Sequence, residues 1–286
     1  MLLAFQQPHV RDLGGFTVRR LLPGHPHRLV GPFIFFDHLG PVDFAARTGL
    51  DVRPHPHIGL ATVTYLFQGA FLHRDSLGVV QRIEPGDVNW MTAGGGIVHS
   101  ERTPDDLRAT GSTLHAIQTW VALPRAHERV APTFEHHAGA TLPRLSLPGV
   151  ALCLIAGTAF GLTAPTTTFS PTLYAAVEMA SGSTLALPTE HEERAVYPVA
   201  GDVTIDGTPV PETTLAVLHA GREAIIRANS AARLMLLGGA PMDGERHIWW
   251  NFVASDLGLI DAAKQRWRHD GFGQIPGETE FIPLPD

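Results

Sequence analysis

The sequence contains a single cysteine, Cys153, so the chain cannot form a disulfide bond within itself. This cysteine usage fits the reducing environment of the cytoplasm. A long basic run is also missing, and the formal net charge is −7. Proteins that bind nucleic acids normally carry a basic stripe, so we expect no direct nucleic-acid partner.

Long apolar segments are equally scarce. The apolar N-terminal residues 1–5 meet two glutamines and a proline too early to form the core of a signal peptide. The longest apolar run, residues 150–162, is too short to span a bilayer. We therefore expect a soluble, cytoplasmic protein without a membrane partner. We also expect a monomer, because each half of the chain can cover the other.

Short strand signals fill most of the chain. Segments rich in β-branched and aromatic residues are separated by turn signals about every eight to twelve residues, which is typical of a β-sandwich or barrel. The 29 glycines and 23 prolines are scattered along the sequence, as many short turns require. Strands are predicted at residues 61–67, 79–83, 88–91, 97–101, 115–123, 173–179, 195–199, 203–205, 215–218, 224–228 and 233–237.

The two halves of the chain look related. Tyr65-Leu-Phe-Gln-Gly69 and Tyr197-Pro-Val-Ala-Gly201 share a Tyr-x-x-x-Gly strand end, and each is followed by another strand. Two tandem β-barrels are the economical interpretation of this short match. Between them, residues 124–149 form a polar stretch with little strand character, where we place the domain boundary. The predicted domain ranges are 1–135, 150–240 and 241–286.

The tail after the second barrel changes character. Residues 255–268 place Leu257, Ile260, Ala263 and Trp267 at near-helical spacing. A short C-terminal helix is predicted there, with Ser255 as its N-cap.

Two short motifs carry the chemistry: His55-Pro56-His57 and His99-Ser100-Glu101. Each places two polar residues at positions i and i+2, which point to the same face of a β-strand. Three imidazoles and one carboxylate that converge in one barrel would form a mixed N/O site. Such a site suits a transition metal with open positions better than a closed structural zinc.

Each motif alone has an ordinary explanation. Because the chain has 16 histidines, a single His-x-His is often uninformative. His25-Pro26-His27 has the same pattern but lies in a Pro/Gly-rich stretch, so we interpret it as a solvated loop. His99 and Glu101 alone could equally be a surface salt-bridging pair. Together, in their strand and turn context, the two motifs favour a metal site.

The strand after His57 predicts a substrate pocket. If one strand runs unbroken from His55 to residue 67, its odd positions face the metal, while Thr62 and Thr64 point away. A bulge at Gly59 would break this phase. The odd positions would then line an apolar, aromatic pocket suited to a flat substrate, formed by Ala61, Val63, Tyr65 and Phe67.

The motifs resemble those of the cupin superfamily, G-x5-H-x-H-x(3,4)-E-x6-G followed by P-G-x5-P-x-G-x2-H-x3-N. More narrowly, the chain resembles the pirin family of two-cupin proteins. The resemblance runs almost continuously from about residue 10 to residue 123, and Pro171-Thr-Leu-Tyr174 extends it loosely into the second half. The segments that carry it are 31–38 (GPFIFFDH), 53–59 (RPHPHIG), 64–66 (TYL), 85–94 (PGDVNWMTAG) and 96–101 (GIVHSE).

The resemblance implies an all-β fold of two tandem cupin (jelly-roll-like) barrels. In pirin-like proteins the N-terminal cupin binds one metal, usually iron, through three His and one Glu, and these roles carry over to His55, His57, His99 and Glu101. The usual cupin glutamate would fall at residues 61 and 62, where no carboxylate stands, so Glu101 has to supply the acidic ligand. Fe(2+) is the expected metal, although the ligand set also accepts Ni, Co, Mn, Cu or Zn.

The second cupin is expected to be metal-free. Alignment of Tyr197 with Tyr65 places Leu187 and Thr189 where His55 and His57 stand. A fallback cluster remains nearby, although a solvated loop explains it well: His191, Glu192, Glu193 and His219.

The resemblance also implies an activity. Some pirins are similar to quercetin 2,3-dioxygenase, in which O2 opens the heterocycle of a metal-bound flavonol and CO is released. We therefore expect a dioxygenase that acts on a flavonol or a similar enol or catechol, with Glu101 as ligand and general base. The alternative is an iron- and redox-sensing module of the transcriptional co-regulator type, which binds a protein partner without turnover. A metal-stabilised scaffold is a third possibility.

Overall fold

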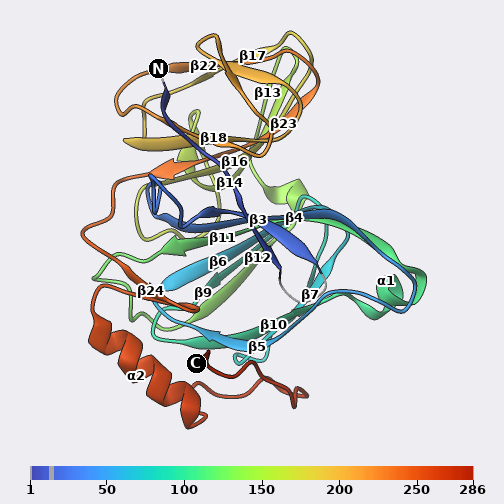
Figure 1. Ribbon diagram of the computed structural model, residues 1–286, viewed down its shortest axis with the longest axis vertical. Coiled ribbons are helices and arrows are strands. Elements are labelled where there is room, and N and C mark those ends of the chain that lie inside the picture. The colour runs from blue at the N-terminus through green and yellow to red at the C-terminus, as the bar shows by residue number, and fades with distance from the viewer. Residues whose placement is uncertain (1, 13–15, 286) are drawn as a thin grey trace. The chain divides into compact units, whose positions relative to one another are not determined.

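The computed structural model describes residues 2–12 and 16–285, and most of its elements are β-strands (Figure 1). The helical elements are α1 (Asp105–Thr110), the 3-10 turn η1 (Gly139–Thr141) and α2 (Leu257–Arg268). The strands of the first half are β1 (Leu2–Gln6), β2 (His9–Asp12), β3 (Thr17–Leu22), β4 (Phe33–Phe44), β5 (Asp51–His57), β6 (Leu60–Gln68), β7 (Phe71–Asp75), β8 (Val80–Ile83), β9 (Val88–Thr92), β10 (Ile97–Arg102) and β11 (Ser112–Ala122).

The second half adds shorter strands, many of them joined by tight turns. They are β12 (Thr133–His137), β13 (Arg144–Leu147), β14 (Val150–Ala159), β15 (Leu162–Thr163), β16 (Thr172–Met179), β17 (Thr184–Leu187), β18 (Glu193–Ala200), β19 (Val203–Ile205), β20 (Thr208–Val210), β21 (Leu215–Leu218), β22 (Ala224–Ala228), β23 (Ala232–Gly239), β24 (His247–Trp249) and β25 (Phe252–Ala254).

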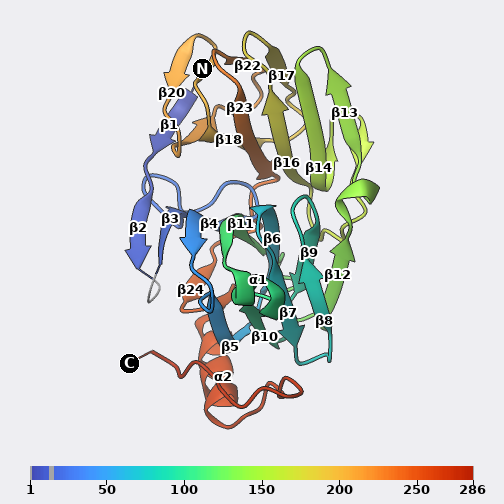
Figure 2. The ribbon, with the colours of Figure 1, turned by 90° about the vertical axis from the view of Figure 1, so that its right-hand side faces the viewer.

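Antiparallel pairing assembles these strands into sheets (Figure 2). Their orders are β12-β9-β6-β11-β4-β3-β2, β5-β10-β7-β8, β1-β21-β18-β23-β16-β14-β13 with β15 on β14, β17-β22-β19-β20 and β24-β25. The predicted all-β class with a short C-terminal helix is confirmed.

The chain forms two compact units, and both are discontinuous in sequence. Unit 1 consists of residues 1–37 and 141–242, and unit 2 consists of residues 38–140 and 243–286. The domain ranges expected from the sequence stay a prediction.

Aliphatic side chains fill the interior of unit 1. Its core cluster combines leucine, valine, isoleucine and alanine residues from both of its larger sheets, and Leu187 is fully buried in it. Burial of this surface stabilises the unit by roughly 25 cal/mol per Å². Leu187 is one of the two residues aligned above with a histidine ligand, and its surroundings are apolar. Thr189, the other, is exposed in the turn that follows β17.

Two members of the fallback cluster, His191 and Glu193, make contacts within unit 1. His191 Nε2 lies 2.7 Å from the carbonyl oxygen of Thr158. A carboxylate oxygen of Glu193 accepts a hydrogen bond from the backbone N–H of Gly31 at 2.6 Å. These contacts hold loops of unit 1 in place, because a buried backbone group needs a hydrogen-bonding partner.

Unit 2 differs in that it buries a group of polar side chains beside its apolar ones. Strand β10 lies between β5 and β7, and the register places His99 directly opposite His55 on one side and Asp75 on the other. Cross-strand partners share a face of the sheet, so these side chains project together. The short sheet β5-β10-β7-β8 therefore carries the candidate site.

The strand expected from His55 to residue 67 is interrupted. β5 ends at His57, β6 begins at Leu60, and the two strands belong to different sheets. Gly59 makes the corner with φ +69°, and a Cβ at this position would approach the carbonyl oxygen of Val253 to 1.9 Å. A glycine is required there because it accepts positive φ and leaves room for the neighbouring backbone. The predicted unbroken strand is wrong. The corner at Gly59 shifts the inward and outward alternation of the residues that follow, which is the effect expected of a bulge at this position.

Two further expectations from the sequence need correction. Residues 124–149 do form strands, β12 and β13, because β12 pairs with β9 and β13 pairs with β14. These partners are distant in sequence, so local propensity does not reveal them.

The N-cap of the predicted C-terminal helix is also displaced by one residue. Helix α2 begins at Leu257, and Asp256 Oδ1 accepts a hydrogen bond from the backbone N–H of Gly258 at 2.7 Å. The Ser255 hydroxyl instead donates to Glu128 Oε1 at 2.7 Å. Glu128 thus takes the hydroxyl that could have capped the helix.

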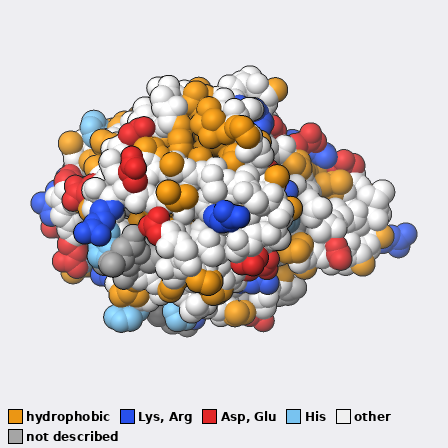
Figure 3. All heavy atoms as spheres, turned by 90° about the horizontal axis from the view of Figure 1, so that it is seen from above, with side chains coloured by type: hydrophobic (Ala, Val, Ile, Leu, Met, Phe, Trp, Pro, Cys, Tyr) orange, Lys and Arg blue, Asp and Glu red, His pale blue; other side chains and the backbone are white. Residues whose placement is uncertain are grey.

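No helix in the described part of the chain is both long and apolar enough to cross a membrane. On the face seen in Figure 3, acidic and basic side chains are interspersed around a gathering of apolar ones.

The corner at Gly59 generates a stability prediction. We expect Gly59→Ala to lower the free energy of unfolding by clearly more than Gly78→Ala does. Gly78 also has positive φ (+86°), but a Cβ there meets nothing within 4 Å, so this control isolates the backbone strain of about 1–2 kcal/mol. Chemical denaturation of both variants measures the difference. Equal losses would contradict the close contact with Val253.

Candidate metal centre

Three histidines of unit 2 converge in the interior of the barrel. His55 and His57 come from β5 and His99 from β10, and one ligand atom of each lies within 4.8 Å of the others. All three side chains are buried, with exposed fractions of 7%, 1% and 1%. The cluster therefore contains both histidines of the first motif and His99 of the second.

The outer nitrogen of each β5 imidazole is held by a backbone carbonyl. His55 Nδ1 donates to the carbonyl oxygen of Arg53 at 2.8 Å, and His57 Nδ1 donates to that of Asn251 at 3.1 Å. A carbonyl oxygen only accepts hydrogen bonds, so the proton of each neutral ring lies on Nδ1. Nε2 of both rings consequently presents a lone pair to the centre of the cluster.

The inner nitrogens of His57 and His99 are in close contact. Their Nε2 atoms lie 3.1 Å apart. Two nitrogens that bind one ion at about 2.1 Å with a right angle between them are about 3.0 Å apart. The spacing therefore fits two adjacent ligands of a single metal ion.

Burial keeps these rings neutral, as metal ligation requires. It lowers the pKa of His55 to about 4, with an additional effect of His73, while the hydrogen bond to Arg53 acts in the opposite direction. Burial also lowers the pKa of His57 and of His99 well below the ordinary histidine value. A neutral, preoriented three-imidazole set suits a divalent transition metal.

Glu101 lies on β10, two residues beyond His99, and is buried. The Thr64 hydroxyl donates to Glu101 Oε1 at 3.0 Å and also lies 2.8 Å from Gln118 Oε1. Burial raises the pKa of the Glu101 carboxyl, while His73 and the Thr64 hydroxyl act in the opposite direction. Among the residues that the structure describes, the group with ligand atoms within 4.8 Å of one another consists of the three histidines, so the role of Glu101 as a fourth ligand stays a prediction.

The contact between Thr64 and Glu101 also reverses the expected face of β6. Thr64 pairs with Gln118 and Thr62 with Trp120, whose ring centroid lies 5.2 Å from that of His57. The even positions of β6 therefore face the histidines. Because strand residues alternate, the positions expected to line the substrate pocket point to the other face of β6, and they are Ala61, Val63, Tyr65 and Phe67. The shared face expected for them and the histidines is wrong.

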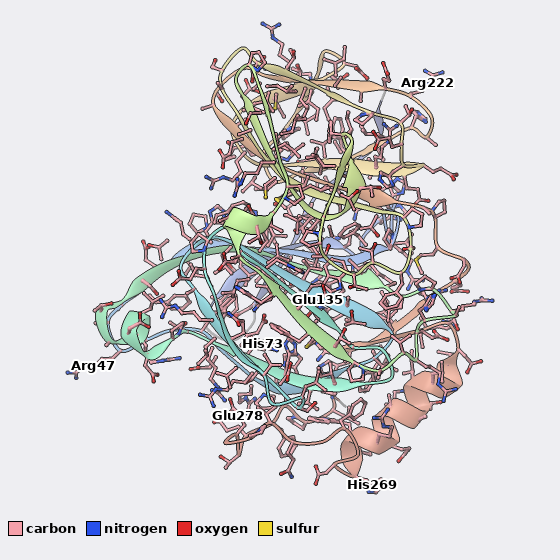
Figure 4. The ribbon with its side chains drawn as sticks, turned by 180° about the vertical axis from the view of Figure 1, so that it is seen from behind. Arg47, His73, Glu135, Arg222, His269 and Glu278 are labelled. Carbon is pink, nitrogen blue, oxygen red and sulfur yellow. The ribbon has the colours of Figure 1, made fainter. Side chains whose placement is uncertain are left out.

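The sequence argument missed a second polar pair in this barrel. His73 and Asp75 lie on β7, are almost fully buried, and contact each other through His73 Nε2 and Asp75 Oδ2 at 3.0 Å. His73 Nδ1 in turn lies 3.4 Å from His99 Nδ1. In Figure 4, His73 lies between the sheet that contains β5 and β10 and the sheet that contains β6 and β9. The i, i+2 spacing in His73-Arg74-Asp75 is the signal that could have found this pair.

The C-terminal segment of unit 2 supports the centre from outside. Besides the Asn251 carbonyl, it supplies Glu278, which accepts hydrogen bonds from the Ser100 hydroxyl at 3.0 Å and from Arg102 at 2.7 and 3.1 Å. Ser100 and Arg102 alternate with His99 and Glu101 along β10. Glu278 therefore holds the strand that carries the candidate ligands.

Comparison with known proteins places this geometry in a family. The family model described as "Pirin" matches residues 15–121, and the model of the pirin C-terminal cupin domain matches residues 174–273. A pirin-like protein of Caulobacter vibrioides is 47% identical over 281 residues, which cover 96% of each chain. The chain belongs to the pirin family. Its two β-barrels are accordingly the tandem cupins expected from the sequence motifs.

Other pirin relatives carry names that refer to an activity. A Pseudomonas aeruginosa protein, named as a candidate quercetin 2,3-dioxygenase, is 44% identical over 92% of this chain and 82% of its own. The crystal structure of a quercetin 2,3-dioxygenase from Acinetobacter baumannii matches with a TM-score of 0.92 and 33% identity, and it covers 100% of this chain and 95% of that one. A bacterial pirin of Escherichia coli, solved in complex with nickel(II), is 18% identical with a TM-score of 0.64 over 84% of this chain and 99% of its own, and it bears on the fold alone.

The cluster generates a prediction about metal binding. Co(II) or Ni(II) in large excess should raise the melting temperature of the protein, since a ligand at 100 times its dissociation constant stabilises by about 2.7 kcal/mol. His57→Ala should abolish most of this increase because it removes one of three converging nitrogens. His25→Ala should retain it, because His25 is an exposed loop residue of unit 1. An equal increase in His57→Ala and the wild type would contradict the site.

Proposed function

We propose that the protein is an iron-dependent dioxygenase of the pirin family, which opens a flavonol or a similar enol or catechol with O2. The observation that carries this proposal is the convergence of three buried imidazoles, each with one ring nitrogen within 4.8 Å of the others, with Nε2 of His57 and of His99 3.1 Å apart. The similarity over the whole chain to a quercetin 2,3-dioxygenase supports the same reaction class.

In this proposal His55, His57, His99 and Glu101 hold one Fe(2+) ion. When bound, such an ion supplies Lewis acidity and open positions for substrate oxygen and O2. For quercetin the reaction consumes one O2 and yields one CO and a ring-opened ester that retains the remaining atoms. No further reductant is required.

The residues of the chain have distinct tasks in this reaction. The flavonol hydroxyl must lose its proton, and we assign Glu101 as the base that accepts it. Thr64 orients the carboxylate through its hydrogen bond to Oε1. Asp75 is unsuited to the same task, because its oxygens already accept from Leu77, Val79 and His73. The tight burial of the histidines keeps bulk water from the reacting groups.

The altered phase of β6 changes the expected surroundings of the substrate. Thr64, Gln118 and Trp120 lie on the inward face, so polar groups and one indole stand beside the histidines. An oxygen-rich aromatic compound matches this combination, because the ring can pack on Trp120 while its oxygens meet hydrogen-bonding groups.

Turnover of quercetin tests the proposal. Protein freed of metal and reloaded with Fe(2+) under anaerobic conditions should, on addition of air, consume quercetin and release CO in equal amounts. Loss of the flavonol absorbance and detection of CO provide the measurement. Absence of turnover with iron, nickel, cobalt and manganese would overturn the proposed reaction for this substrate.

A carboxylate variant tests the base. Glu101→Gln should lower kcat by about 10²- to 10⁴-fold, the usual contribution of a positioned base, because an amide cannot accept the proton. Glu84→Gln is the control. Glu84 is an exposed ion-pair partner of Arg82, so removal of its charge should leave kcat unchanged. Full activity in Glu101→Gln would remove the assigned role.

A further inference from the structure

A chain of hydrogen bonds runs from Asp75 through His73 to His99. Asp75 Oδ2 lies 3.0 Å from His73 Nε2, and His73 Nδ1 lies 3.4 Å from His99 Nδ1. Asp75 is fully buried, and His73 is 2% exposed. The other members of the candidate centre, His55 and His57, are oriented by backbone carbonyls. His99 alone among the three is held through another imidazole.

The hydrogen bonds of Asp75 determine which nitrogen of His73 carries the proton. Asp75 Oδ1 accepts the backbone N–H groups of Leu77 at 2.9 Å and Val79 at 3.1 Å. An ionised carboxylate only accepts hydrogen bonds, so the nitrogen that faces Oδ2 must carry a proton. The proton of a neutral His73 is therefore on Nε2, and its Nδ1 presents a lone pair to His99.

By the same reasoning, the contact with His73 determines which nitrogen of His99 carries the proton. Because His73 Nδ1 is an acceptor, the proton of His99 lies on Nδ1, and His99 Nε2 is left with its lone pair. That atom is the one 3.1 Å from His57 Nε2. The ring of His73 is itself held by Phe134, which stacks on it with ring centroids 4.4 Å apart and an interplanar angle of 23°. The stacked ring is oriented with Nε2 toward Asp75 and Nδ1 toward His99.

We propose that Asp75 sets, through His73, the tautomer of His99 that presents Nε2 to a metal, and that Asp75 and His73 are positioning residues of the centre. This inference rests on the proposed metal site. It extends the ordinary arrangement, in which a carboxylate orients a ligand histidine directly, by one additional imidazole.

An isosteric substitution should exchange donor and acceptor in each hydrogen bond between residue 75, His73 and His99. In Asp75→Asn, the amide oxygen has to remain at Oδ1 to accept from Leu77 and Val79, since an NH2 group there would face two donors. The NH2 group then faces His73 Nε2 and donates to it. His73 must move its proton to Nδ1, His99 must accept at Nδ1, and the proton of His99 moves to Nε2, where it blocks ligation.

The tautomers can be measured without metal. Long-range ¹H–¹⁵N NMR of metal-free, ¹⁵N-histidine-labelled protein should give His99 with its proton on Nδ1 and His73 with its proton on Nε2. In Asp75→Asn both assignments should be inverted. A wild-type His99 with its proton on Nε2 would overturn the proposal, whether or not the variant folds and whether or not the protein proves to be a dioxygenase.

Affinity for Co(II), measured by competition with a chelator, provides the second readout. Asp75→Asn should bind Co(II) about 10- to 100-fold more weakly than the wild type, the usual effect of a lost outer-shell partner. Asp206→Asn should bind like the wild type, because Asp206 accepts a backbone N–H of Ile225 in unit 1, outside the centre. Wild-type affinity in Asp75→Asn would contradict the inference.

A double variant separates tautomer control from structural damage. His73→Phe retains an aromatic ring against Phe134 but has no nitrogen that could determine the tautomer of His99. This variant should therefore bind Co(II) less than about 10-fold more weakly than the wild type. Asp75→Asn combined with His73→Phe should bind Co(II) as tightly as His73→Phe alone, and therefore more tightly than Asp75→Asn alone. Losses that add in the double variant would overturn the relay, because independent structural effects are additive.

Discussion

The centre of this protein depends on one electrostatic constraint. Three imidazoles are buried with one ring nitrogen of each within 4.8 Å of the others, and lone pairs that face one another repel unless a cation lies between them. Hydrogen bonds at each Nδ1 hold the rings in this orientation. The surrounding structure therefore offsets the repulsion between the rings. Burial, strand register and the C-terminal segment all serve this one geometry, as is common in preorganised metal sites.

The two cupin barrels illustrate how one architecture accommodates opposite interiors. In unit 1 the interior is a continuous aliphatic cluster, whereas in unit 2 histidine, threonine, glutamine and carboxylate side chains converge. Some of these groups are hydrogen-bonded to one another, as Thr64 is to Glu101 and Gln118, and such bonds offset the cost of their burial. Unit 1 is stabilised by apolar burial, whereas the buried polar side chains of unit 2 form the candidate metal centre.

Much of the site could be predicted from the sequence because its signal is local. The i, i+2 spacing in His55-Pro56-His57 and His99-Ser100-Glu101 needs only the alternation of a strand. His73 and Asp75 have the same spacing, yet their role depends on the pairing of β7 with β10, which no local pattern reveals. The reversed face of β6 also depends on a contact between residues distant in sequence, because the corner at Gly59 packs closely against the carbonyl of Val253.

The orientation of His57 by Asn251 has a consequence for biosynthesis. The two residues are 194 positions apart, and Glu278, which secures the strand of His99, lies further still along the chain. While the protein is being translated, His57 and the strand of His99 are synthesised long before their partners Asn251 and Glu278. The arrangement around His57 and β10 can therefore form only after residues 251 and 278 have been synthesised.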